Sequence, residues 1–191
     1  MNLLERKVFQ HYWDDGLLDL FAAIGILMIG ISWLRDFPVG AVFVPALLVP
    51  FWKPVRRKVI EPRLGLVEFT EAREHRNQRM LKVIMYFGIA VLILAIELYF
   101  VRDSLPMEPT VALIAGLPAM LLAVLAIITA GLIGSSRFFV YALILVTIGV
   151  GGALLDWVPG KILAVAGGIM LAIAGGLLMQ FMRENPPGES E

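Results

Sequence analysis

Cysteine is absent from this 191-residue chain, and histidine occurs only twice, at His11 and His75. Without cysteine there is no disulfide bond, no thiolate metal site and no cysteine nucleophile. Two isolated histidines form no His-Glu-x-x-His motif, so we expect no metal, no cofactor and no catalytic residue. The one acid–base grouping, His75 with Glu71 and Glu74, is typical of a solvated helix face.

Charge is also scarce. Asp, Glu, Lys and Arg make up 17% of the chain, whereas soluble domains carry about 25%. The formal net charge is zero, which leaves no basic footprint for binding nucleic acid. Hydrophobic residues fill the chain instead, at 59% of the sequence and a mean hydropathy of +0.84. This composition predicts an integral membrane protein.

Six apolar segments account for this composition. They cover residues 17–34, 39–52, 83–101, 111–133, 138–155 and 162–182. A helix needs about 20 residues to cross the hydrocarbon core of a bilayer. Five segments meet that length, whereas the second has only 14 residues and contains Pro45 and Pro50. The sequence therefore predicts an all-α integral membrane fold: a six-helix transmembrane bundle with a short, proline-broken second helix and a basic cytoplasmic loop.

The positive charges predict the orientation of this bundle. Nine of the sixteen Lys and Arg residues fall between Lys53 and Lys82. If all six segments cross, thirteen positive charges lie inside and three outside, which is the bias of cytoplasmic loops. We therefore expect a multi-pass protein of the plasma (inner) membrane with both termini cytoplasmic. In the alternative, the second segment dips into the bilayer and returns, and the amino terminus then lies outside.

The chain divides into five regions on this basis. Residues 1–16 place Leu4, Val8 and Tyr12 on one face and are expected to form an amphipathic interfacial helix. Residues 17–52 form a transmembrane hairpin, 53–82 the basic cytoplasmic loop, and 83–182 a four-helix transmembrane region. Residues 183–191, rich in proline, glycine and glutamate, form a disordered tail.

The basic loop is the clearest candidate contact surface. Its nine basic and four acidic residues give a net charge of +5 with His75 neutral. Lys and Arg beside a bilayer attract anionic lipid, and they also suit a phosphate-bearing ligand or a soluble partner. The candidate contacts for anionic lipid headgroups or a partner are Lys53, Arg56, Arg57, Lys58, Arg63, Arg73, Arg76 and Arg79.

The same loop contains the run Glu61-Pro-Arg-Leu-Gly-Leu-Val-Glu-Phe69. This run resembles a motif of uncharacterised prokaryotic polytopic membrane proteins, which have a Pro-Arg-(Ile/Leu)-Gly-Tyr-Val core in a cytoplasmic loop. Leu66 stands where that core has Tyr. The matching residues are Pro62, Arg63, Leu64, Gly65 and Val67. The resemblance implies a polytopic membrane architecture and brings no activity with it.

Two further features lie inside the apolar segments. Ala164, Gly168, Ala172 and Gly176 recur every four residues, and such small residues let a neighbouring helix approach closely. That neighbour is a helix of the same chain or of another copy. Glu97 is a carboxylate within the third segment, where it either pairs with a headgroup or arginine or forms a proton or cation site.

These features favour a scaffold or a regulatory or interaction subunit that acts by helix packing, with the basic loop as its cytoplasmic contact surface. The expected partners are the bilayer, anionic lipid headgroups, and another copy or a membrane protein, but not nucleic acid. The alternative is a small transporter or channel that uses the proline-broken second helix and Glu97. A lipid-modifying enzyme is the third possibility.

Overall fold

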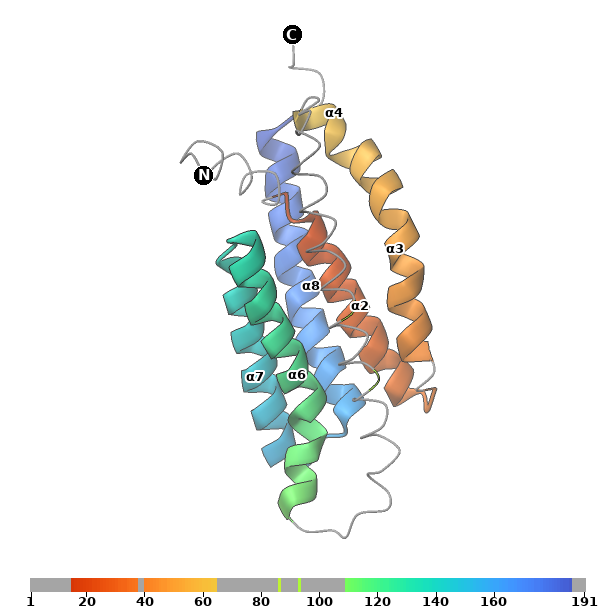
Figure 1. Ribbon diagram of the computed structural model, residues 1–191, viewed down its shortest axis with the longest axis vertical. Coiled ribbons are helices and arrows are strands. Elements are labelled where there is room, and N and C mark those ends of the chain that lie inside the picture. The colour runs from red at the N-terminus through yellow and green to blue at the C-terminus, as the bar shows by residue number, and fades with distance from the viewer. Residues whose placement is uncertain (1–14, 38–39, 65–85, 87–92, 94–108, 187–191) are drawn as a thin grey trace.

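The computed structural model of the chain describes residues 15–37, 40–64, 86, 93 and 109–186. Within these ranges the ordered elements are all helices and no strand occurs. The helices are α2 (Leu17–Leu34), α3 (Gly40–Val59), α4 (Glu61–Leu64), α6 (Pro109–Ile133), α7 (Arg137–Leu154) and α8 (Pro159–Glu184). Figure 1 shows the long helices lying side by side as a bundle, with the short α4 at one end.

Four of these helices are long and apolar enough to cross a membrane: α2, α6, α7 and α8. They confirm the first, fourth, fifth and sixth predicted segments, which hydropathy identified because Asp19 is the one charged residue within them. The third predicted segment, with Glu97, lies outside the described residues except for Tyr86 and Ile93. Residues 1–14 of the predicted interfacial helix, the basic loop beyond Leu64 and residues 187–191 of the tail also lie outside them.

Helix α3 differs from the prediction of a short, broken helix. It runs for 20 residues without interruption, so the first cationic residues of the predicted loop belong to its last turns. Pro45, Pro50 and Pro54 each remove a backbone donor, and Figure 1 shows the helix curving along its length. Packing against α2 offsets the local cost of the prolines. The charges at its end keep α3 out of the group of apolar spans.

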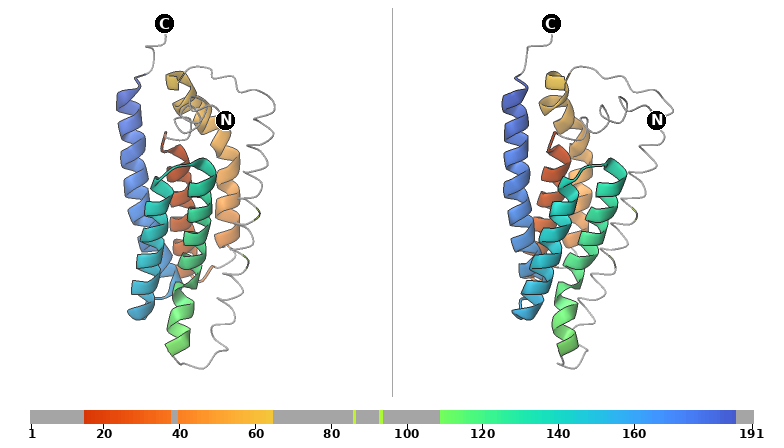
Figure 2. Two further views of the ribbon diagram at one scale, coloured as in Figure 1. Left: turned by 60° about the vertical axis from the view of Figure 1, so that its left-hand side comes forward. Right: turned by 90° about the vertical axis from the view of Figure 1, so that its left-hand side faces the viewer.

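The bundle is built from two closely packed helix pairs. The most extensive contacts join α2 with α8 and α6 with α7, while α3 packs against α2 and α7 against α8. Figure 2 shows α3 and α8 on opposite sides of α2. Gly16, just before α2, lies against Leu177 and Leu178 near the end of α8, so α2 and α8 are antiparallel.

Glycine allows the two helices of each pair, α2 with α8 and α6 with α7, to approach each other closely. A methyl group added at Gly167 of α8 would come within 2.5 Å of the Leu27 backbone nitrogen in α2. One added at Gly116 of α6 would come within 2.5 Å of the Gly149 carbonyl oxygen in α7. Gly30 lies against the backbone of Ala164 in the same manner. Close backbone approach of this kind maximises dispersion contacts, which hold helices together where no water drives association.

The contact face of α8 follows a seven-residue spacing rather than the predicted four-residue spacing. Gly160, Gly167 and Ala174 are all buried. At 3.6 residues per turn, a four-residue step drifts about 40° around the helix, whereas a seven-residue step drifts only about 20° in the opposite direction. Of the predicted set, Ala164 therefore touches α2, while a methyl group at Gly168 or Gly176 would meet no atom within 4 Å. Packing between copies through Gly168 and Gly176 stays a prediction.

Candidate functional site

Positive charge gathers at one end of the bundle. The starts of α2 and α7 meet the ends of α3 and α8 there, because Asp15 contacts Arg56, Asp19 contacts Arg137, and Gly16 contacts α8. We call this the basic end. Among the described residues it holds Lys53, Arg56, Arg57, Lys58, Arg63, Arg137 and Arg183, whereas the opposite end, called here the turn end, holds Arg35 and Lys161.

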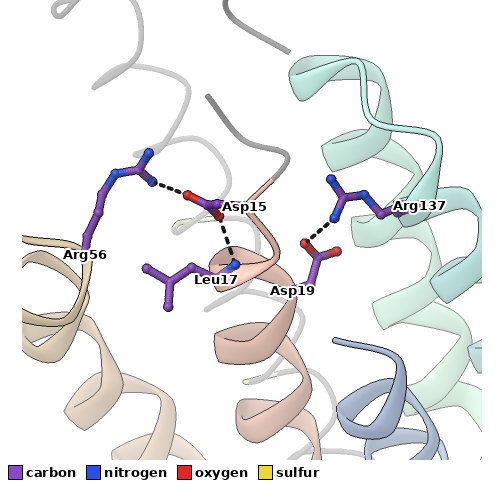
Figure 3. A network of polar contacts seen from close by, with 5 residues as sticks. All are labelled: Asp15, Leu17, Asp19, Arg56 and Arg137. Carbon is purple, nitrogen blue, oxygen red and sulfur yellow. Dashed lines mark hydrogen bonds and ion pairs between the residues drawn. The ribbon is translucent and has the colours of Figure 1, made fainter. Parts of the chain in front are cut away.

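Asp15 and Arg56 form a buried ion pair between the start of α2 and the end of α3 (Figure 3). Their side chains are 0% and 6% exposed, and Asp15 Oδ2 lies 3.3 Å from Arg56 Nη1. The backbone N–H of Leu17 donates to Asp15 Oδ1 at 2.9 Å, so the carboxylate also satisfies the first turn of α2. Burial raises the pKa of Asp15 above its usual range, although Leu17 and Arg56 both act to lower it.

Asp19 forms a second interhelical pair one turn further along α2. Its Oδ2 lies 3.6 Å from Arg137 Nη1 of α7, and its side chain is 1% exposed. Tyr141, one turn after Arg137, buries its hydroxyl beside the same carboxylate. The position of Asp19 near one end of an apolar segment suggests a solvated carboxylate, but the structure buries it and neutralises it with Arg137.

Arg63 closes the end of α8. Its Nη1 donates to the carbonyl oxygens of Met182 at 2.8 Å and Asn185 at 2.9 Å. The last carbonyl groups of a helix have no partner within it, and a cation there also complements the helix dipole. The arginine of the Pro-Arg-Leu-Gly run therefore joins α4 to the end of α8.

The predicted lipid or partner contacts thus have different environments. Arg56 and Arg63 make internal contacts, whereas Lys53, Arg57 and Lys58 are exposed. Arg73, Arg76 and Arg79 lie outside the described residues, as do Glu71, His75 and Glu97. Sequence reasoning missed Asp15, for which the available signal was an acidic residue directly before an apolar run.

At the turn end, the turns that follow α2 and α7 have the same backbone geometry. Asp36 after α2 and Asp156 after α7 both adopt a left-handed backbone, with φ of 52° and 53°. The next residue in each case donates its N–H back into the helix, Phe37 to Ser32 and Trp157 to Gly152. The Lys161 ammonium lies 4.2 Å from the centre of the Trp157 ring, a pairing suited to the membrane interface.

The buried charged side chains at the basic end have a structural role. Each carboxylate faces a guanidinium group on another helix, so the two pairs hold α3 and α7 against the start of α2. Within the part of the chain that the structure describes, no three His, Asp or Glu side chains are grouped to hold a metal ion. Comparisons with protein families, with curated proteins and with solved structures gave no match to this chain.

Proposed function

We propose that this chain is a membrane scaffold or a regulatory or interaction subunit, which acts through helix packing and through its basic end. The observation that carries this proposal is the glycine-mediated packing of α2 with α8 and of α6 with α7. Side chains cannot enter between backbones this close, so the bundle is suited to act as a rigid support. The buried ion pairs tie α3 and α7 to the same support.

Six spans with both termini cytoplasmic remain the proposed topology, and the directions of the helices support it. Helix α3 ends beside Asp15 at the basic end, whereas α6 begins at the turn end, since Gly116 lies against Gly149 and Ala153 near the end of α7. Residues 65–108 connect these opposite ends, and the apolar stretch 83–101 within them suits a crossing. The path of α3 along α2 speaks against a segment that dips in and returns.

The basic end is proposed to face the cytoplasm of a plasma (inner) membrane. Seven described cations lie there and two at the turn end, in accord with the excess of Lys and Arg in cytoplasmic loops. Exposed Lys53, Arg57 and Lys58 are the surface offered to a partner or to anionic headgroups. The alternative of a transporter or channel depends on a broken second helix, so the uninterrupted α3 gives it less support.

A comparison of matched charge variants tests the proposal. Partners cross-linked to the full chain in native membranes are measured for the parent, for Arg57→Gln with Lys58→Gln, and for Arg35→Gln with Lys161→Gln. The same two charges are removed at opposite ends. A partner lost only from the first variant is the expected result. Solute or ion flux by the purified chain in liposomes, with no partner lost from either variant, would refute the scaffold proposal and support transport.

A further inference from the structure

The outward-facing surface of α3 changes from apolar to cationic along one line. Phe43, Leu47 and Phe51 are spaced by four residues and are 60%, 62% and 58% exposed. Arg57 and Lys58 are also exposed. At about 100° per residue, all five side chains fall within about 120° of the helix circumference. We call these five residues the α3 outer face.

The part of this face from Leu47 to Arg57 matches one leaflet of a bilayer in length. Leu47 and Arg57 are ten residues apart, or about 15 Å along a helix, and half of a typical hydrocarbon core is also about 15 Å. A phospholipid whose phosphate lies at Arg57 and Lys58 would therefore lay an acyl chain over Phe51 and Leu47 and towards Phe43. Large aromatic side chains offer wide apolar contact for such a chain.

The charges on this face favour an anionic headgroup. Arg56 faces Asp15 and Arg63 holds the end of α8, whereas their neighbours Arg57 and Lys58 project outward. Two adjacent cations can share one phosphate, Arg through its planar fork and Lys as a point charge. Their long apolar stems allow the charged groups to reach headgroup level from a helix that begins in hydrocarbon.

We propose that the α3 outer face is a binding site for one anionic phospholipid, with its phosphate between Arg57 and Lys58 and an acyl chain along Phe51, Leu47 and Phe43. This site rests on the membrane location and orientation of the proposed function. It goes further by naming the lipid class and the helix face that holds it. Arg56, although part of the same basic cluster, is not a ligand.

Native mass spectrometry of the full chain with phosphatidylglycerol or phosphatidylcholine of equal chain length tests the site. We expect tighter binding of phosphatidylglycerol to the parent, weakened by added salt. Replacing Arg57 and Lys58 with Gln should lower that affinity by about 15- to 30-fold, because each cation near the membrane surface contributes about 1 kcal/mol. Arg35→Gln with Lys161→Gln, at the turn end, should leave the affinity unchanged.

Two further arms separate a lipid site from a simple charge effect. Phe51→Ala should weaken the binding of phosphatidylglycerol several-fold, because apolar contact with the acyl chain is lost. Inorganic phosphate should not displace the lipid at matched concentration, because phosphate lacks an acyl chain. Equal loss in both charge variants, full displacement by phosphate, or a parent that binds both lipids equally would each overturn the site. A parent that binds both lipids equally overturns the site even if a variant fails to fold. Lipid binding without partner capture would refute the scaffold alone, and partner capture without lipid preference would refute the lipid site alone.

Discussion

Two adjacent glycines of α8 provide the sharpest test of the packing. A Cβ at Gly167 would lie 2.5 Å from the Leu27 nitrogen and 2.7 Å from Leu27 Cα, whereas unstrained carbon contacts lie at about 3.5–4.0 Å. Relieving this clash requires α2 and α8 to separate by roughly 1 Å, and the close contact of Gly30 with Ala164 would loosen with them. Overpacking of this kind costs about 1–3 kcal/mol, and we expect Gly167→Ala to fall near the upper end.

Gly168→Ala is the matched control. A Cβ at Gly168 would meet no atom within 4 Å, so no clash opposes the change. Alanine favours a helix over glycine by about 0.5–1 kcal/mol, which predicts unchanged or slightly greater stability. The two variants should therefore differ by about 3 kcal/mol in free energy of unfolding. Reversible unfolding of the purified chain in mixed detergent micelles measures that difference.

The reasoning would be refuted if the two variants were equally stable, or if Gly168→Ala were the less stable one. Size-exclusion chromatography with light scattering adds a second reading. A shift from oligomer to monomer in Gly168→Leu, with the monomer fully stable, would show that the open face with Gly168 and Gly176 packs between copies.

The remaining predictions concern the basic end. Arg56→Gln should lower the free energy of unfolding by about 3–5 kcal/mol, because ionised Asp15 is left buried without its cation, and adding Asp15→Asn should recover most of that loss. In the parent, the raised pKa of Asp15 means that the native state still holds a proton at pH values where the unfolded state has released it. The free energy of unfolding should therefore fall as the pH rises from 3.8 to the raised pKa, and then level off. Asp15→Asn should lack this pH dependence. Arg63→Gln should cost about 1–3 kcal/mol and speed amide exchange in the last turn of α8, with Arg57→Gln as the unaffected control. A reporter fused after Glu191 should be active only on the cytoplasmic side, and activity outside would contradict the six-span topology.

Hydropathy was sufficient to predict four helices, with bounds within three residues of those in the structure. The first apolar segment coincides with α2, and the fifth differs from α7 by one residue at each end. These bounds are predictable because charge and turn-forming residues stop abruptly where the hydrocarbon-spanning helix begins. Helix α3 was predicted too short because Lys53 and the following cations, which mark the edge of an apolar segment, do not end a helix. A helix can leave the hydrocarbon core and continue into the headgroup layer.

The partners of buried side chains were beyond the sequence. Asp15 meets Arg56 and Asp19 meets Arg137 across long stretches of chain, and no local spacing links either pair. The sequence could not select the face of α8 that contacts α2, since a four-residue and a seven-residue spacing of small residues both occur on this helix. Only the position of α2 selects Gly167 over Gly168.

Neighbouring arginines in one basic run have opposite environments because each residue turns the helix by about 100°. Arg56 turns inward to Asp15, while Arg57 turns outward on the same helix. Arg63 then returns to the bundle and holds the last carbonyl groups of α8. In this chain, Arg63 therefore has a structural contact that requires no substrate. The excess of positive charge predicts the orientation of the whole segment, but the angle of each residue around α3 determines which cations are exposed.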